Sequence, residues 1–207
     1  MPYAAMDAQA SGPADDAALI SSARRGDLNA FETLVSRHQT RMLNISLRLT
    51  GDFDDACEVV QDAFLSAYKN LKSFRGESKF TTWLTAITVN LSKNRLRHTR
   101  SRQGHEAFSI NEHFPGENGQ MTLDLPSKER SVLSKLEQQE VQYHVQNCVK
   151  ALEEDFREVL VLRDLQDFSY EEIGSILNIR EGTVKSRLFR AREMVKDCLK
   201  RIIGELL

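Results

Sequence analysis

The sequence predicts an all-α protein in which two small helical domains are joined by a flexible linker. Apolar residues recur at steps of three and four in two long blocks, the period of amphipathic helices. We find no alternating segment or turn chemistry typical of a strand pair. All four prolines lie in the first 13 residues or within residues 103–131, and a stretch rich in proline and glycine is typical of a linker.

These patterns place a disordered tail at residues 1–16, a first domain at 17–102, the linker at 103–131 and a second domain at 132–207. The 207 residues are 41% hydrophobic and 28% charged, with a net charge of −2, which is ordinary for a soluble protein with one or two modest cores. No apolar run approaches the roughly 20 residues that cross a bilayer. The N-terminal stretch lacks the features of a secretory signal. We therefore expect a cytoplasmic protein that does not insert into membranes.

Three helices are expected in the first domain. The first covers residues 31–49, and Gly51 ends it because glycine readily takes the left-handed conformation of a C-cap. The second starts at the aspartates of residues 52–55, since carboxylates favour a helix N-terminus, and continues to Leu71. The third begins near Lys79 and carries its apolar side chains on one side before it leads into a basic run.

The second domain contains the outline of a helix-turn-helix. Ser169 and Glu172 are spaced as a capping box at the start of a short helix. Asn178 and Ile179 form a turn, and a longer helix follows. Helices of about eight and fifteen residues joined by a tight polar turn are typical of this motif.

Neither the cysteines nor the histidines indicate a metal or redox site. Cys57, Cys148 and Cys198 lie far apart without a CxxC pair, and the histidines lack metal-ligand spacing. We therefore expect buried or idle thiols in a reducing cytoplasm, no metal and no cofactor. The sequence also contains no phosphate-binding loop and no nucleophile motif, so we expect a protein that is not an enzyme.

The helix that begins "EGTVKSRLFRAR", residues 181–192, gathers lysine and arginine, with no acid between Thr183 and Arg192. Its apolar period predicts a buried stripe of Val184, Leu188, Ala191 and Val195. The side chains that then project away from the core are Lys185, Ser186, Phe189 and Arg190. A solvated helix face usually mixes both signs of charge, and an exposed phenylalanine favours a partner such as a thymine methyl group. We therefore favour a DNA major groove over a merely solvated face.

A second basic run, "KNRLRHTRSR" at residues 93–102, follows a helix that carries Phe80 and Trp83. Cations beside aromatic rings are typical of surfaces that hold an unstacked single strand. A lone tryptophan at helical spacing is usually part of a core, so we interpret the aromatic residues as mainly structural and the basic run as functional.

The stretch "DFDDACEVVQD", residues 52–62, has the opposite sign and contains no base. Helix capping explains some of its carboxylates. The others, beside Val59, Val60 and Phe64, would suit a protein partner with a basic helical surface. The small net charge therefore reflects charges that are segregated along the chain.

Three motifs together resemble the extracytoplasmic-function (ECF) sigma factors of bacterial RNA polymerase, most like the sigma-E type. They are "DDACEVVQDAFLSAYKNLKSFRG", "FTTWLTAITVNLSKNRLR" and "LRDLQDFSYEEIGSILNIREGTVKSRLFRARE". The match covers residues 19–102 and 138–203. Each motif is fairly specific to the family. All three in this order, with a linker between the second and the third, are highly specific.

The resemblance implies that the first domain is sigma region 2 and the second is sigma region 4. The protein would bind core RNA polymerase, through its β′ clamp and its β subunit, and direct promoter-specific initiation of a stress or envelope-response regulon. An anti-sigma factor commonly occludes both domains in this family. The implied polymerase-binding residues are Asp54, Asp55, Glu58, Val59, Gln61, Asp62 and Phe64.

The resemblance also implies two contacts with promoter DNA, single-stranded at the minus-ten element and duplex at the minus-thirty-five element. A base shows its whole edge only once it is unstacked, which suits readout of a melted strand. The implied minus-ten residues are Arg75, Lys79, Phe80, Asn90, Lys93, Asn94 and Arg97. The implied minus-thirty-five residues are Tyr170, Thr183, Lys185, Ser186, Arg187, Phe189 and Arg190.

Two features depart from the family pattern: Leu152 is followed by Glu153 where the family commonly has proline, and the tail before Ala17 has no match. Two other functions stay open. A self-sufficient helix-turn-helix regulator would bind a palindrome as a dimer, but its first domain would not need a nucleic-acid surface. A DNA-cutting recombinase would need a nucleophile or clustered metal-binding carboxylates, and we see neither.

Overall fold

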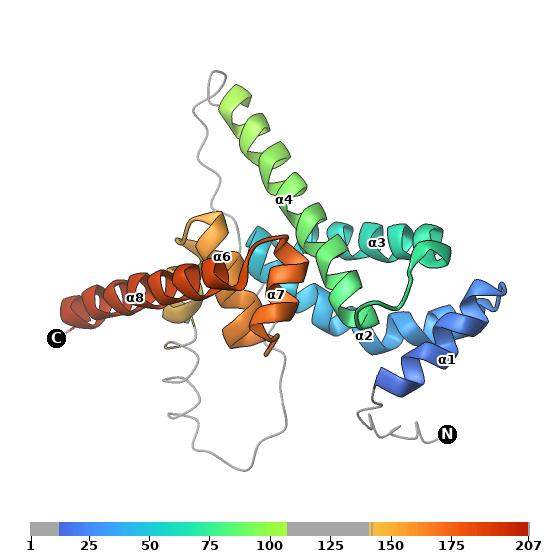
Figure 1. Cartoon of the computed structure of the whole chain (residues 1–207). Helices are drawn as coiled ribbons and strands as arrows, with labels where there is room; N and C mark the ends of the chain where they lie inside the picture. Colours follow the sequence, from blue (N-terminus) through green and yellow to red (C-terminus); the bar gives the residue numbers. More distant parts are fainter. Residues whose placement is uncertain (1–12, 107–140, 142, 207) are drawn as a thin grey trace, which may run out of the picture.

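The computed structural model describes residues 13–106, 141 and 143–206, and within them every regular element is helical (Figure 1). The all-α prediction is confirmed. In chain order, the helices of the first unit are α1 (Pro13–Arg24), α2 (Leu28–Thr50), α3 (Phe53–Asn70), the short 3-10 helix η1 (Leu71–Ser73) and α4 (Phe80–Glu106). Those of the second unit are a helical segment at residues 143–150, α6 (Glu154–Leu160), the π-helical η2 (Val161–Leu165), α7 (Tyr170–Leu177) and α8 (Glu181–Leu206).

The ends of the helices follow the predicted capping chemistry. Gly51 ends α2 with a φ of 75°, a conformation that favours glycine. Asp52 begins α3, where its side chain accepts a hydrogen bond of 2.8 Å from the Asp55 amide. At α7 the reciprocal capping box is present between Ser169 and Glu172. These local signals fix where each helix starts and therefore which residues face the core.

The core of the first unit lies where α2, α3 and α4 pack against one another. Leu34, Met42 and Ile45 of α2 are fully buried, as is Leu84 of α4. At the start of α4 an aromatic cluster closes the core. Its rings belong to Phe74, Phe80 and Trp83, with centroids 5.1–5.9 Å apart. The C-terminal part of α4 projects away from this bundle (Figure 1).

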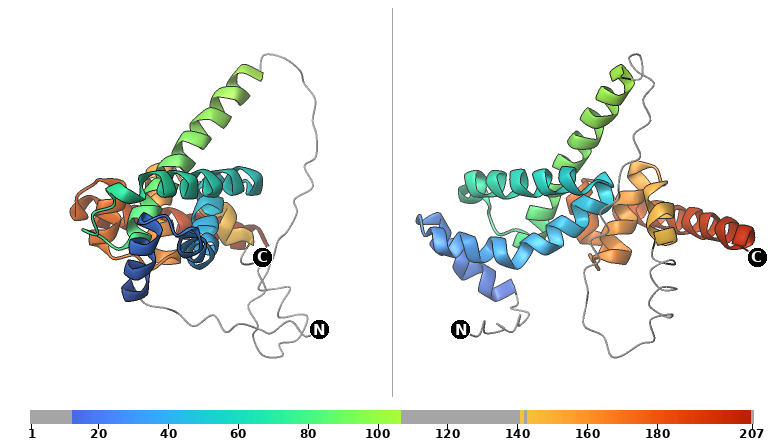
Figure 2. Two further views of the ribbon diagram at one scale, coloured as in Figure 1. Left: turned by 90° about the vertical axis from the view of Figure 1, so that its right-hand side faces the viewer. Right: turned by 180° about the vertical axis from the view of Figure 1, so that it is seen from behind.

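The helix-turn-helix is present, with a second helix longer than expected. Helix α7 has 8 residues, and Asn178 turns the chain with a φ of 53°. A side-chain Cβ on Gly174 would lie 2.9 Å from the Ile179 carbonyl oxygen, so the tight turn requires a glycine there. Helix α8 has 26 residues against the fifteen expected, and its C-terminal end extends beyond the rest of the unit (Figure 2).

Two expected boundaries differ from the structure. Helix α1 begins at Pro13, inside the expected tail, and Asp16 is only 8% exposed. The Asp16 carboxylate lies 3.1 Å from Arg37 and 2.9 Å from His38, which ties α1 to α2. Helix α4 continues to Glu106, past the expected linker start at residue 103. The rest of the tail and of the linker lies outside the described residues.

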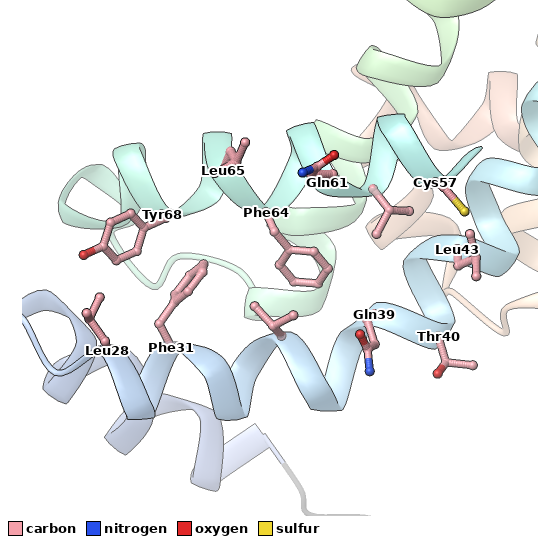
Figure 3. Close-up of a pocket in the computed structure, with 12 residues that line it drawn as sticks. Leu28, Phe31, Gln39, Thr40, Leu43, Cys57, Gln61, Phe64, Leu65 and Tyr68 are labelled. Carbon is pink, nitrogen blue, oxygen red and sulfur yellow. The ribbon is translucent and has the colours of Figure 1, made fainter. Parts of the chain in front are cut away.

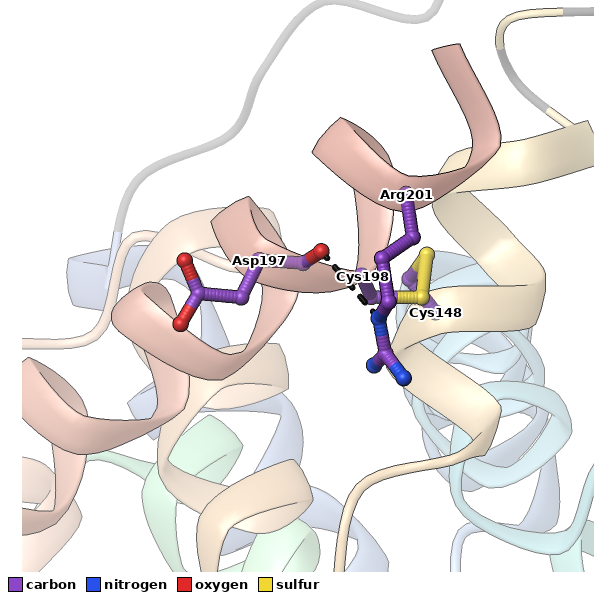
Figure 4. The surroundings of a disulfide bond; sticks show 4 residues. All are labelled: Cys148, Asp197, Cys198 and Arg201. Atoms are coloured by element: carbon purple, nitrogen blue, oxygen red, sulfur yellow. Dashed lines mark hydrogen bonds between the residues drawn. A yellow bond between two sulfur atoms is a disulfide. The ribbon is translucent and has the colours of Figure 1, made fainter. Parts of the chain in front are cut away.

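The expectation that the thiols are idle is wrong for two of the three cysteines. Cys148, in the helical segment 143–150, and Cys198, in α8, form a disulfide whose Cα atoms are 5.8 Å apart (Figure 4). Beside it, Arg201 donates a hydrogen bond to the Asp197 carbonyl oxygen. Cys57 is an exposed free thiol. The bonded cysteines are 50 positions apart in the sequence, so their proximity is a property of the fold that no local spacing reveals.

The two units pack against each other, chiefly through α4 and α7 and through α2 with α6 and η2 (Figure 2). The Arg157 guanidinium donates a hydrogen bond of 2.8 Å to the Leu49 carbonyl oxygen across this contact. Arg41 of α2 donates to the Gln166 carbonyl oxygen, and its guanidinium carbon lies 4.4 Å from the centre of the Phe168 ring. Specific hydrogen bonds therefore join the two units in addition to the packing of their helices.

Candidate functional surfaces

The first candidate surface is the exposed face of α8. Val184, Leu188 and Ala191 are buried as the period predicts, and they fix the helix against α6 and α7. On the opposite side Phe189 is 68% exposed, beside an exposed Arg190. We call the exposed set of Lys185, Ser186, Phe189 and Arg190 the α8 face.

The other predicted residues of this region lie around the α8 face with structural roles. Arg187 is turned toward α6, where it forms an ion pair of 2.5 Å with Asp155, so the structure places it away from the α8 face. Tyr170 of α7 is partly buried, and the Lys185 ammonium lies 5.6 Å from the centre of its ring. Thr183 is partly buried, and its carbonyl oxygen accepts a hydrogen bond from the Ser186 hydroxyl.

Arg192, which the sequence grouped with the basic residues of this helix, is also held inside the unit. Its guanidinium makes a bidentate contact with Asp164 of η2, at 2.6 and 2.9 Å. This hydrogen-bonded pair raises the pKa of Arg192 above its ordinary value. Of the cations that follow Glu181, only Lys185 and Arg190 therefore lie on the α8 face itself.

The second candidate surface is an apolar groove of about 730 Å³ between α2 and α3 (Figure 3). Leu28, Leu65 and Tyr68 line it, with 58%, 50% and 42% of their surface exposed. We call it the α2–α3 groove, and its lining residues are Leu28, Phe31, Val35, Gln39, Thr40, Leu43, Cys57, Val60, Gln61, Phe64, Leu65 and Tyr68. Exposed apolar patches of this kind mark binding sites for other proteins in soluble chains.

The acidic stretch at the start of α3 is only in part available to a partner. Asp55 and Glu58 both form ion pairs with Arg95 of α4, at 2.7 and 2.6 Å. These two carboxylates are therefore neutralised within the protein, which the sequence pattern did not reveal. Asp54 and Asp62 are exposed.

The other predicted residues on α3 differ in how they meet the α2–α3 groove. Gln61 is exposed and lines the groove. Phe64 is 7% exposed and forms part of its wall. Val59 is 4% exposed and faces the core, so the structure leaves it no surface for a partner.

The third candidate surface is one side of α4. Asn90, Asn94 and Arg97 are exposed, and Lys93 lies on the same side at helical spacing. Arg75, in the preceding loop, keeps 84% of its side chain exposed. Phe80 is 4% exposed and belongs to the aromatic cluster, so the structure does not place it on this surface.

Two lysines of this third surface are engaged by carboxylates of the second unit. Lys79 lies 2.9 Å from Glu172, and Lys93 lies 2.9 Å from Glu158. Burial raises the pKa of Glu158 above its ordinary value, and Lys93 offsets part of that effect. Partial burial also acts on Glu172, but hydrogen bonds from Lys79 and Ser169 bring its pKa below the ordinary value.

The described residues hold no group of histidine, cysteine or carboxylate side chains that could bind a metal ion. None of the helices described is both long enough and apolar enough to cross a membrane.

Comparison with known proteins decides the family. The family described as Sigma-70 region 2 matches residues 34–102, and the one described as Sigma-70, region 4 matches residues 144–195. The RNA polymerase sigma-H factor of Pseudomonas aeruginosa is 36% identical over 192 residues, which are 92% of this chain and 96% of that protein. The ECF RNA polymerase sigma-E factor of Escherichia coli K12 is 37% identical over 190 residues, 91% and 96% of the two chains. The chain belongs to the ECF sigma factors.

Solved structures share the fold of this sigma factor. The structure of CnrH in complex with the cytosolic domain of CnrY matches with a TM-score of 0.64 at 24% identity, over 90% of this chain and 98% of that one. The sigma factor RpoE of Bartonella quintana, solved with the anti-sigma factor NepR, matches with a TM-score of 0.61 at 24% identity, over 82% and 96%. Both proteins were solved with a bound partner.

Sequence reasoning about this sigma factor missed the α2–α3 groove and the contact between the units. The groove joins residues from two helices, so the apolar period of a single helix does not reveal it. An excess of apolar residues on α3, with Leu65 and Tyr68 outside its buried stripe, was the available signal. The ion pairs of Lys79 and Lys93 leave no such signal, because their partners lie far away in sequence.

Proposed function

We propose that this sigma factor binds core RNA polymerase through α3 and the α2–α3 groove and places the α8 face on duplex DNA at the minus-thirty-five element. The α8 face carries the proposal, because an exposed Phe189 between Lys185 and Arg190 on a capped helix-turn-helix fits a major groove. The polymerase supplies the catalytic site, so the chain acts as a specificity subunit without an enzymatic activity of its own. Since it works with polymerase on the chromosome, we infer that it acts in the cytoplasm.

The exposed side of α4 is the proposed minus-ten surface, formed by Asn90, Lys93, Asn94 and Arg97. Its amides offer donors and acceptors to the edge of an unstacked base, and its cations follow the phosphates. Arg75 and Lys79 at the start of the helix extend the positive surface. Phe80 supports this surface from the core, where it packs against Trp83.

The α2–α3 groove is also the proposed site for an anti-sigma factor. Its volume of about 730 Å³ and its apolar lining suit the nonpolar face of an amphipathic helix. Asp54 and Asp62 would favour a partner helix with basic flanks. Polymerase and the inhibitor would then compete for one surface.

Run-off transcription with purified protein, bacterial core polymerase and genomic promoter fragments tests this function. We expect transcripts whose start sites share a pair of upstream elements. If no transcript appears but the protein alone retains palindromic duplexes as a dimer, the chain is a self-sufficient regulator. If neither is seen, both assignments are wrong.

Reversing the charge of Asp62 is expected to impair polymerase binding while the fold is kept. Asp62 is exposed on α3 next to Gln61 of the α2–α3 groove, so Asp62→Arg changes the surface but no described contact. We expect affinity for core polymerase to fall by about tenfold or more, a typical effect of a like charge at an interface. Glu32→Arg, an exposed carboxylate of α2 that does not line the groove, is the matched control. Equal affinities for the two variants would contradict the assignment.

Truncating Arg190 is expected to weaken binding at one or two positions of the minus-thirty-five element. If its guanidinium contacts a base edge, Arg190→Ala loses about 1–3 kcal/mol on the preferred sequence and discriminates less at that position. Binding assays on a duplex library measure this directly. Lys200→Ala, an exposed cation farther along α8, serves as control. An equal loss on every sequence would show that Arg190 only contacts phosphate.

A further inference from the structure

The loop between η1 and α4 is a run of exposed residues, 75–79, with a buried ring at each end. Phe74, just before the loop, is 8% exposed, and Phe80, just after it, is 4% exposed. The loop contains Arg75 and Lys79, which the proposed function assigns to the minus-ten surface. The direction in which these two cations project therefore depends on how firmly the two rings are held.

The ring at the start of the loop is held from α1 by Arg24. The guanidinium carbon of Arg24 lies 5.9 Å from the centre of the Phe74 ring. Its Nε donates a hydrogen bond of 3.0 Å to the carbonyl oxygen of Leu71, the first residue of η1. Leu71 is itself 2% exposed. One side chain of α1 therefore contacts both the backbone and the ring that lead into the loop.

The ring at the end of the loop is held from α1 through His38 of α2. The centres of the His38 and Phe80 rings lie 5.4 Å apart. The Nε2 of His38 lies 2.9 Å from the carboxylate of Asp16 in α1, and the other oxygen of that carboxylate lies 3.1 Å from Arg37. Because both oxygens of Asp16 are engaged, the carboxylate has a fixed orientation, and it fixes the imidazole ring in turn.

We propose that α1 is a brace that sets the conformation of the 75–79 loop, and with it the base discrimination of the minus-ten surface. Its positioning residues are Arg24 at one end of the loop and the Asp16–His38 pair at the other. The proposal rests on the proposed function, because it requires that the loop and α4 face promoter DNA. Recognition groups discriminate well only where supporting side chains hold them to within about 0.5 Å.

The placement of α1 suits a brace. Ile20 and Ala23 are each 6% exposed, and they anchor the helix, which packs against α2 and η1. The match to Sigma-70 region 2 begins at residue 34, so Asp16 and Arg24 lie outside the part of the chain that this family description covers. Arg24 is exposed, so its replacement leaves no cavity in the core. Any effect on the loop would come from the lost contacts.

Transcription by the holoenzyme of Arg24→Met tests the brace. The templates are a promoter found by run-off transcription and its variants with one minus-ten base changed, all with the same minus-thirty-five element. A wrong base in a specific site typically costs about five- to 150-fold. We expect the ratio of transcript from preferred and changed templates to fall by about three- to tenfold at one position or more. A smaller amount of folded protein would lower every yield equally and leave this ratio unchanged.

Arg25→Met is the matched control. Arg25 is the next residue, it is also exposed, and its guanidinium donates to the hydroxyls of Ser21 and Ser22 on α1. We expect its holoenzyme to keep the ratios of the wild type. Equal ratios for Arg24→Met and Arg25→Met would overturn the brace and leave the sigma function intact. If the wild-type holoenzyme makes no transcript from any template, the proposed function is wrong.

The fluorescence and near-UV circular dichroism of Trp83 test the brace without DNA. The centre of its ring lies 5.1 Å from that of Phe74 and 5.8 Å from that of Phe80. In the free full-length protein, we expect Arg24→Met and Asp16→Ala to change both Trp83 spectra at unchanged far-UV circular dichroism. Asp16→Asn keeps an oxygen that accepts from His38, so it should restore most of the wild-type signal. Wild-type Trp83 spectra in Arg24→Met and Asp16→Ala would overturn the brace.

Discussion

Replacement of Arg157 by methionine is expected to lower the free energy of unfolding of the second unit by about 3–5 kcal/mol. Arg157 is 6% exposed, and its guanidinium donates to the carbonyl oxygens of Lys150 and Leu152 as well as to Leu49 of the first unit, at 2.7–2.8 Å. Methionine keeps the aliphatic stem but leaves these buried acceptors without their donor. A buried acceptor that loses its partner carries its whole desolvation cost.

Urea denaturation followed by far-UV circular dichroism and by fluorescence separates the effect on the two units. Trp83 is the only tryptophan of the chain and lies in the first unit, so its fluorescence reports on that unit alone. The Arg157→Met transition should move to lower urea in circular dichroism, and much less in Trp83 fluorescence. Arg157→Lys keeps the positive charge but loses the planar guanidinium with its several donors. Its transition should therefore lie between those of wild type and Arg157→Met. The exposed Arg201→Met should match wild type, and a loss below about 1 kcal/mol for Arg157→Met would contradict the role assigned to it.

Local chemistry accounts for how well the helices were predicted. Gly51, Asp52 and the Ser169–Glu172 box each act on neighbouring residues, so their effects are legible in the sequence and appear unchanged in the structure. Helical spacing worked for the same reason on α8, where Val184 and Leu188 are buried and Phe189 is exposed. Helix α1 has no counterpart among the three helices expected in the first domain, and α4 continues past the expected linker start. Asp16, for example, extends α1 through contacts with a different helix.

The candidate surfaces were predicted less completely, because charged residues can be neutralised by partners far away in sequence. Arg187 and Asp155 are 32 positions apart, and Lys93 and Glu158 are 65 apart, so a basic run reveals nothing of which cations stay available. The sequence also did not reveal that Val59 is buried. That residue lies on the predicted partner-binding helix, but it faces the core. The sequence pattern assigns each predicted surface to a helix, and the tertiary contacts decide which side chains of that helix are exposed.

Loss of the Cys148–Cys198 disulfide is expected to destabilise the second unit by about 4 kcal/mol. The bond closes a loop with a sequence separation of 50, which contains α6, η2, α7 and the α8 face. Opening that loop gives the unfolded chain more conformations and so favours unfolding. The bond also ties the segment 143–150 to α8. This segment contains Lys150, whose ammonium lies 3.4 Å from the Gly51 carbonyl oxygen of the first unit.

Oxidised wild-type protein and Cys198→Ser, compared by urea denaturation, give the size of this effect. Treating the wild type with dithiothreitol should reproduce the Cys198→Ser curve, because both lack the same bond. Cys57→Ser, which removes the exposed free thiol, should leave the oxidised protein unchanged. The transition of Trp83 fluorescence should again move least, since the closed loop lies wholly in the second unit. If Cys198→Ser and oxidised wild type unfold at the same urea concentration, the bond contributes nothing to stability, and packing alone holds α8 against residues 143–150.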